Sequence, residues 1–249
     1  MPYVFPPLPP AAVPVAGRAH ELFPVHRIYC VGRNYAKYAI EMGGSGRDAP
    51  FFFTKPADAV LPVPAGAVGQ MPYPPQTHDL HHEIELVVAI GKDGFEIPAA
   101  LAMDYVWGYA VGLDMTRRDL QIEARRMGGS WCTAKGFDHA APIGPIYPIS
   151  QTGPLQEGEI WLNVNGAKRQ RSNIDKLIWN VPDTIEQLSR FFELKQGDLI
   201  FTGSPEGVAE VQEGDLLEGG ISGLGELRVM IWPRMAAGFS PDPEPMRRR

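Results

Sequence analysis

The pattern of apolar and polar positions along the chain predicts many short strands separated by turns. The segment Ile84–Ile90 is almost continuously apolar, which is typical of a strand buried on both faces. Glycine (27 residues) and proline (25 residues) are spread through the whole sequence, as expected where turns are frequent. The other predicted strands are Arg27–Val31, Phe51–Thr54, Val106–Leu113, Ile160–Val164, Asp198–Thr202 and Leu224–Ile231.

Helical signals are fewer. In the predicted helix Thr116–Met127, Thr116 is a candidate N-cap and Gly128 ends the helix. The predicted helix Pro182–Glu193 has an apolar stripe formed by Ile185, Leu188 and Phe192. Strands therefore outnumber helices and do not alternate with them, which favours an α+β fold, a mixed β-sandwich or β-roll with a few short helices, over a doubly wound sheet. The three predicted helices are Asn34–Met42, Thr116–Met127 and Pro182–Glu193.

The chain of 249 residues, 44% of them hydrophobic, is long enough for one large domain with a substantial core. We expect that domain to cover residues 25–232. Proline is concentrated before it, so residues 1–24 are predicted to form an extended N-terminal arm. Residues 233–249 hold four further prolines and end in three arginines, and we expect a flexible tail there.

Composition and charge argue against some classes of binding partner and cellular location. A net charge of −6 and the lack of a basic stripe argue against nucleic-acid binding. No stretch approaches the roughly 20 apolar residues of a membrane span, and the first residues lack the pattern of a signal peptide. The two cysteines, Cys30 and Cys132, form no disulfide framework and fit a reducing compartment. These observations predict a cytoplasmic protein.

Two carboxylates stand at the start of the most apolar strand. Glu83 and Glu85 are two residues apart, so on a strand they share one face. Buried carboxylates that lie side by side repel each other unless a cation lies between them. Oxygen ligands favour Mg²⁺, Ca²⁺ or Mn²⁺ over zinc. The alternative is a solvated edge strand, which the apolar flanking residues disfavour.

Two further residues can extend this site. Asp114 follows the predicted strand Val106–Leu113, and a carboxylate at a strand end can complete a three-carboxylate metal shell. The alternative is an ordinary turn aspartate. Lys135 is flanked by small residues and is a candidate buried cation.

Six phrases in this order, spread between Val25 and Ile231, give the chain a resemblance to a known family. The phrases are Tyr29–Tyr35, Phe53–Pro56, His81–Glu85, Gly112–Thr116, Ala134–Asp138 and Thr202–Pro205. On these phrases the chain resembles the fumarylacetoacetate hydrolase family, and within it the small acylpyruvate-hydrolase branch that includes the fumarylpyruvate hydrolases.

The resemblance implies a mixed β-roll, a homodimer and a bound Mg²⁺ or Mn²⁺ held by Glu83, Glu85 and Asp114. It also implies cleavage of a carbon–carbon bond in a dicarboxylic keto acid, an acylpyruvate such as fumarylpyruvate or maleylpyruvate, in the catabolism of aromatic compounds. Lys135 matches the family lysine near the reacting oxygens. The positions that correspond to substrate-contacting segments are Arg33, Tyr35, Arg118, Gln121 and Thr202.

The chain departs from the family pattern at one catalytic position. Many relatives carry a histidine three residues before a glutamate, and that pair activates water. Here the glutamate is Glu41, but Tyr38 stands in place of the histidine. Because tyrosine titrates near pH about 10, it is a poor base at neutral pH.

Three interpretations follow from this departure. Glu41 activates water with Tyr38 orienting it, or another histidine, His82 or His139, replaces the missing one. Otherwise the site performs chemistry without a hydrolytic base, such as oxaloacetate decarboxylation or keto–enol tautomerisation. A non-catalytic keto-acid binder is the remaining alternative.

Overall fold

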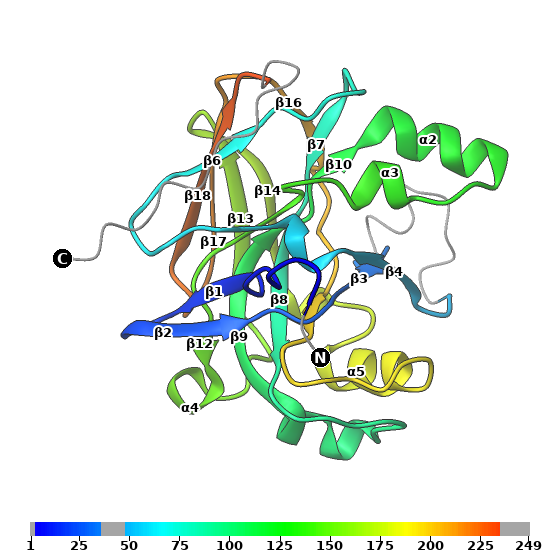
Figure 1. Ribbon diagram of the computed structural model, residues 1–249, viewed down its shortest axis with the longest axis vertical. Helices are drawn as coiled ribbons and strands as arrows, with labels where there is room; N and C mark the ends of the chain where they lie inside the picture. The colour runs from blue at the N-terminus through cyan, green and yellow to red at the C-terminus, as the bar shows by residue number, and fades with distance from the viewer. Residues whose placement is uncertain (1–2, 36–47, 235–249) are drawn as a thin grey trace.

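The computed structural model describes residues 3–35 and 48–234. Its largest sheet has strand order β4-β3-β15-β8-β9-β11-β5, and β12 also pairs with β9 (Figure 1). These strands are β3 (Ile28–Gly32), β4 (Phe51–Lys55), β5 (Val60–Pro62), β8 (Ile84–Ile90), β9 (Val106–Leu113), β11 (Ala141–Ile143), β12 (Tyr147–Pro148) and β15 (Leu199–Phe201).

A second sheet, with order β14-β13-β17-β18-β6, packs against the first. Its strands are β6 (Gly69–Pro72), β13 (Glu159–Val164), β14 (Ala167–Asn173), β17 (Leu216–Ile221) and β18 (Glu226–Trp232). A small three-stranded sheet combines β7 (Leu80–His82), β10 (Thr116–Arg117) and β16 (Ala209–Val211). The predominance of sheet with a few short helices confirms the predicted α+β class.

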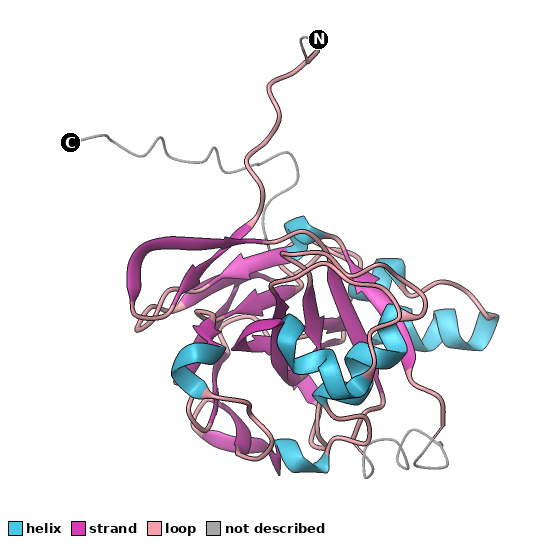
Figure 2. Ribbon diagram, turned by 90° about the horizontal axis from the view of Figure 1, so that it is seen from below, coloured by secondary structure: helices cyan, strands magenta, loops and turns pink. Residues whose placement is uncertain are grey.

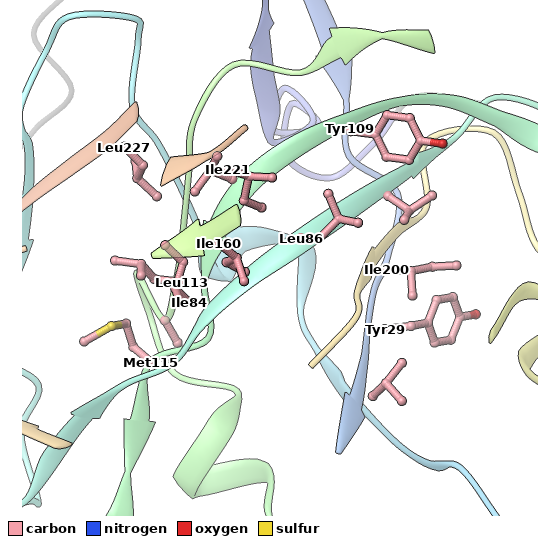
Figure 3. Packing of buried hydrophobic residues seen from close by; sticks show 14 of the residues in the cluster. Tyr29, Ile84, Leu86, Tyr109, Leu113, Met115, Ile160, Ile200, Ile221 and Leu227 are labelled. Carbon is pink, nitrogen blue, oxygen red and sulfur yellow. The ribbon is translucent and has the colours of Figure 1, made fainter. Parts of the chain in front are cut away.

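The core fills the space between the two large sheets. Side chains of β8, β9, β13 and β17 meet there, as the sticks for Ile84, Leu113, Ile160 and Ile221 show in Figure 3. The sheets approach closely where Gly219 faces Ile84, because a Cβ built on Gly219 would lie 2.4 Å from the Ile84 Cδ1. This contact fixes the position of the start of β8.

Strand β8 lies at the centre of the molecule, and all seven of its residues are buried. Leu86 belongs to the large core between the sheets, whereas Val87 belongs to a second cluster on the opposite face, with Ile28 and Phe201. The two faces predicted from the alternation of side chains are confirmed.

The helices differ in part from the predictions. The second predicted helix begins two residues later, as α2 (Arg118–Met127), because Thr116 belongs to β10 and does not cap it. Gly128 ends α2 in the left-handed conformation, as expected. The third helix, α5 (Val181–Ser189), starts at the N-cap Asn180 and stops before Phe192. The remaining helical elements are α3 (Cys132–Lys135), α4 (Ile149–Thr152) and the 3₁₀ turns η1 (Ala57–Ala59), η2 (Ala99–Tyr105) and η3 (Ile174–Lys176).

The predicted N-terminal arm is shorter than residues 1–24. Strands β1 (Ala12–Val15) and β2 (Arg18–Pro24) form a hairpin, and Phe23 packs 5.2 Å from Trp107 between ring centroids. The apolar positions Val13 and Val15 are buried in the same cluster, so this hairpin is part of the folded body. Figure 2 shows the chain before it projecting away from the sheets.

Two other predicted segments lie mainly outside the described residues. Of the predicted helix Asn34–Met42, only Asn34 and Tyr35 are among the described residues. Of the predicted tail, residues 233–249, only residues 233 and 234 are described. Among the described residues, no helix is long and apolar enough to cross a membrane.

Candidate metal centre

Three carboxylates converge where β8 and β9 lie side by side. Ile84 pairs with Leu113 across the two antiparallel strands, and the Asp114 N–H donates to the Glu83 carbonyl at 2.8 Å. This register brings Asp114 opposite Glu83, with Glu85 next along β8. One carboxylate oxygen from each residue lies within 4.8 Å of the others, and all three side chains are buried. The predicted three-carboxylate cluster is therefore present.

Two buried lysines hold Asp114 between them. The Lys135 Nζ lies 2.6 Å from Asp114 Oδ2 and 3.2 Å from Glu83 Oε2. The Lys55 Nζ lies 2.7 Å from Asp114 Oδ1 and also donates to the carbonyl oxygens of Lys135 and Met115. Lys55 thus links the end of strand β4 to Asp114 and to the backbone of Lys135.

Glu83 is fixed by residues at the start of α2. Arg118 Nη2 lies 2.8 Å from Glu83 Oε1, and the Thr116 hydroxyl donates to the same oxygen at 3.1 Å. Gln121 lies one helical turn after Arg118 and accepts a hydrogen bond from its guanidinium. Because Thr116 uses its hydroxyl on Glu83, it does not serve as the predicted helix cap.

Glu85 is oriented by a backbone turn. The Gly203 N–H donates to Glu85 Oε2 at 2.8 Å, and Gly203 has a φ of +99°. A Cβ at Gly203 would lie 2.8 Å from the Asn34 Cβ and 3.0 Å from the Val31 carbonyl oxygen, so glycine is required at this position. The Ser204 hydroxyl donates to the Ile84 carbonyl at 2.8 Å and fixes the turn.

The two glutamates differ in their electrostatic surroundings. Burial raises the pKa of Glu83, but the charges of Lys135 and Arg118 outweigh it and lower that pKa to about 2. Burial, together with the neighbouring Asp114 and Glu83, raises the pKa of Glu85 well above its usual range. The cluster therefore contains repulsion between carboxylates that a divalent cation bound among them would relieve.

The donor set fits Mg²⁺ or Mn²⁺. Three carboxylates and no soft ligand are typical of hard divalent ions that keep positions open for water or substrate. The space enclosed by the described residues of this site is about 20 Å³, and besides the three acids it is lined by Arg33, Gln121, Lys135 and Ser204. That space exceeds the roughly 10–15 Å³ that one water molecule needs.

Aromatic side chains form one wall of the site. Phe53 of β4 and Trp131, which precedes α3, both line it, with ring centroids 5.8 Å apart in an edge-to-face arrangement. The Lys135 Nζ lies 5.0 Å from the centroid of Phe53. This wall places apolar surface directly beside the buried charges, which strengthens electrostatic interactions there.

The other predicted site residues divide into three groups. Arg33, Arg118 and Gln121 lie at the cluster or contact it, as described above. Tyr35 is buried and does not line the site, and the Thr202 hydroxyl donates to the Leu86 carbonyl at 2.9 Å. The predicted catalytic residues Tyr38 and Glu41 lie outside the described residues.

Neither histidine considered as a substitute base lies at the carboxylates. His82 does not line the space between the carboxylates, and its Nδ1 lies 2.8 Å from Gln170 Oε1. Burial lowers the pKa of His82 to about 4. His139 lines a different cavity, together with Phe137. The interpretation that one of these two replaces the family histidine is not supported by their positions.

Sequence reasoning gave no role at the carboxylates to six residues of the site, although all but Trp131 lie within the family phrases. They are Lys55, Phe53, Thr116, Trp131, Gly203 and Ser204. Lys55 also carried a signal of its own, because a lysine at the end of an apolar strand such as β4 needs an anionic partner if it is buried.

Comparison with known proteins places the chain among relatives of similar length. The family profile "Fumarylacetoacetate (FAA) hydrolase C-terminal" matches residues 27–231. A fumarylpyruvate hydrolase of a Ralstonia species is 45% identical over 183 residues, which cover 74% of this chain and 93% of the relative. A mitochondrial oxaloacetate tautomerase of Arabidopsis thaliana is 41% identical over 84% of this chain and 92% of its own length.

A crystal structure of fumarylpyruvate hydrolase from Pseudomonas aeruginosa, in complex with Mn²⁺ and pyruvate, has a TM-score of 0.92 and 55% sequence identity. The match covers 94% of this chain and the whole of that one. That structure holds a divalent metal ion, and the three carboxylates described above could bind one in this chain. The chain belongs to the fumarylacetoacetate hydrolase family.

Proposed function

We propose that this protein is a divalent-metal-dependent hydrolase that cleaves the carbon–carbon bond of an acylpyruvate, with fumarylpyruvate as the preferred substrate class. The convergence of three buried carboxylates with Lys135 carries the proposal. The fumarylpyruvate hydrolases at 45% and 55% identity support the choice of substrate. The overall reaction adds water across the bond and releases pyruvate and the carboxylic acid of the acyl group.

Glu83, Glu85 and Asp114 would hold Mg²⁺ or Mn²⁺. The bound ion would act as a Lewis acid toward the 1,3-dicarbonyl oxygens and stabilise the enolate that leaves. The Gly203 N–H and Lys55 hold Glu85 and Asp114 in position, so the ligand oxygens are already oriented before substrate arrives.

The chain's own cations would bind and orient the substrate. Lys135 is the only one of the two site lysines that lines the enclosed space, so its ammonium can donate to a substrate oxygen. Neighbouring Asp114 and Glu83 raise the pKa of Lys135 against the opposing effect of burial, so it remains protonated. Arg33 and Gln121 face the same space and would bind the substrate carboxylate.

We further propose that Glu41 takes the proton of the attacking water, with Tyr38 orienting that water by a hydrogen bond. This assignment rests on the family pattern, in which the corresponding glutamate belongs to the water-activating pair. The aromatic wall of Phe53 and Trp131 would exclude other water molecules from the enolate.

A second candidate function is oxaloacetate tautomerisation or decarboxylation at the same centre. Tyr38 in place of the family histidine favours it, because these reactions need the enolate but no hydrolytic base. The 41% identity to an oxaloacetate tautomerase also supports it.

One experiment separates the two candidates. Pyruvate release is measured from fumarylpyruvate and from oxaloacetate, each with Mg²⁺, with Mn²⁺ and with EDTA. Conversion of enol oxaloacetate to its keto form, which releases no pyruvate, is followed by ultraviolet absorbance under the same conditions. We expect metal-dependent cleavage of fumarylpyruvate to be much faster, and EDTA to abolish it. A clear preference for oxaloacetate would replace the hydrolase with the second candidate, and metal-independent turnover would overturn the role of the carboxylates.

The homodimer, the cytoplasmic location and the place in aromatic-compound catabolism stay predictions. Sedimentation at several protein concentrations tests the first of these.

A further inference from the structure

A second and larger cavity lies behind the metal centre. Its volume is about 380 Å³, and none of the residues that line it belongs to the space between the carboxylates. Cavities that bind small molecules usually have volumes of roughly 300–1,000 Å³. Phe137 separates the two sites, because its ring lines the cavity and its centroid lies 5.7 Å from the Lys55 Nζ that contacts Asp114.

Two arginines stacked on aromatic rings line this cavity. The Arg117 Cζ lies 4.4 Å from the centroid of Phe137, and the Arg234 Cζ lies 5.6 Å from the centroid of Tyr73. Each guanidinium also donates one hydrogen bond of 2.9 Å to a backbone carbonyl, of Thr133 and Thr77 respectively. Stacking and these bonds fix both groups in orientation while leaving other N–H donors for a ligand.

Two buried nitrogen atoms at the cavity lack a hydrogen-bond partner within the described part of the chain. They are Arg117 Nε and His139 Nδ1. Buried polar atoms of folded proteins nearly always have a partner, so an unpaired one indicates a ligand or bound water. His139 also has a φ of +62°, a conformation that is costly for residues other than glycine and is found more often at functional sites.

The charges that face the cavity favour an anion. Asp138 lines it too and offsets one of the two guanidinium charges, which leaves one positive charge in excess. Burial lowers the pKa of Arg117, and the attraction of Asp138 and Asp119 only partly opposes that effect. An anionic ligand would therefore meet one half-buried cation, Arg117, to which charge-assisted hydrogen bonds are stronger than at a fully exposed group.

We propose that this cavity is a binding site for a small organic carboxylate. Its carboxylate would meet Arg117 and Arg234, and its apolar body would lie against Phe137 and Tyr73. The site is separate from the proposed catalytic centre, and the proposal does not depend on which reaction that centre catalyses.

The test is isothermal titration calorimetry of the full chain with benzoate and with acetate, in the presence of Mn²⁺ and one equivalent of oxalate per chain, enough to occupy the metal centre without filling the second cavity. We expect saturable binding of benzoate at one site per chain, and clearly weaker binding of acetate, which lacks the apolar body. Arg117→Gln and Arg234→Gln should each lower the affinity for benzoate by about tenfold or more, because each removes a charged donor.

Arg126→Gln, an exposed arginine on α2, is the matched control and should leave the affinity unchanged. Arg234 is exposed as well, so its variant tests the proposal even if Arg117→Gln folds poorly. His139→Asn removes the imidazole while asparagine tolerates the left-handed conformation, and it should also weaken binding.

Three results would overturn the proposal. They are the absence of benzoate binding with the metal centre occupied, equal affinity for acetate and benzoate, and full affinity in the two arginine variants. A cavity covered by a second copy of the chain would give the first of these results.

Discussion

Lys55 and Asp114, 59 residues apart in the sequence, form a buried ion pair with 2.7 Å between Nζ and Oδ1. The same carboxylate receives Lys135 on its other oxygen, so Asp114 is held from two sides. This pair ties the edge strand β4 to the end of β9. It determines how firmly one proposed metal ligand is positioned, and it leads to the first prediction.

Lys55→Met should destabilise the protein by about 3 kcal/mol, because the buried Asp114 carboxylate would keep only one of its two lysine partners. Urea denaturation monitored by circular dichroism measures the change. Lys176→Met is the matched control, since Lys176 pairs with Asp175 at the surface and should contribute less than about 1 kcal/mol. Equal effects of the two substitutions would contradict the role assigned to Lys55.

Glu83→Gln should reduce Mn²⁺ affinity by more than about 100-fold, because it replaces a proposed direct ligand. Loss of a residue that only hydrogen-bonds to a ligand already lowers metal affinity by about 10- to 100-fold. Titration of Mn²⁺ by electron paramagnetic resonance gives the dissociation constant directly. Glu159→Gln, at a surface pair with Arg171, serves as the control and should bind Mn²⁺ like the unaltered protein. Unchanged affinity in Glu83→Gln would remove the three-carboxylate proposal.

Tyr38→His should raise kcat for fumarylpyruvate roughly tenfold or more at neutral pH, because imidazole is a far better base than a phenol there. The activity of this variant should increase with pH through about 6.5, where the imidazole loses its proton. Steady-state pH profiles of both proteins provide the check. A lower kcat in the variant would show that Tyr38 is adapted to this site and is not a deficit.

Trp131→Ala should lower kcat/KM for fumarylpyruvate by about 10- to 100-fold, because it removes part of the apolar wall beside the charges. Turnover of oxaloacetate, which has no extended acyl group, should change less. Initial rates with both substrates test this difference, with the exposed Phe95→Ala as control. A parallel loss on both substrates would assign Trp131 a structural role instead.

Gly203→Ala should destabilise the protein and weaken Mn²⁺ binding, because the new Cβ would press on Asn34 and displace the N–H that orients Glu85. The control is Gly214→Ala. Gly214 has a similar φ of +92°, but a Cβ there meets no atom within 4 Å. Both variants share the backbone strain, but only Gly203→Ala adds the clash with Asn34. Thermal denaturation and Mn²⁺ titration of the two variants therefore separate the effect of strain from the effect of the clash. If Gly214→Ala loses as much Mn²⁺ affinity, the turn has no specific role.

The alternation of side chains along β8 was sufficient to predict the main chemistry of the site. It placed Glu83 and Glu85 on one face, and the end of the next long strand supplied Asp114. These signals are local, because they depend on strand periodicity and on polar residues at strand ends. The small neighbours of Lys135 marked it as a candidate buried cation, and the family resemblance added Arg118 and Gln121.

What the sequence did not reveal depends on contacts between distant segments. Lys55 received no partner from the sequence because Asp114 lies 59 residues further along the chain, and Thr116 looked like a helix cap because its bond to Glu83 is tertiary. The β1–β2 hairpin was missed because the prolines before it suggested an extended arm. Its pairing depends on Val13 and Phe23 packing on the main sheet.

The proposed ion ligands and the aromatic wall come from different parts of the sheet. The ligands stand on or beside the paired central strands β8 and β9, whereas Phe53 lies on the edge strand β4 and Trp131 lies in the connection before α3. Mutations at the rim can therefore change which acid is accepted without altering the register that holds the ion. Such a division would let one scaffold diversify in evolution, and relatives of this chain are named for hydrolysis in one case and tautomerisation in another.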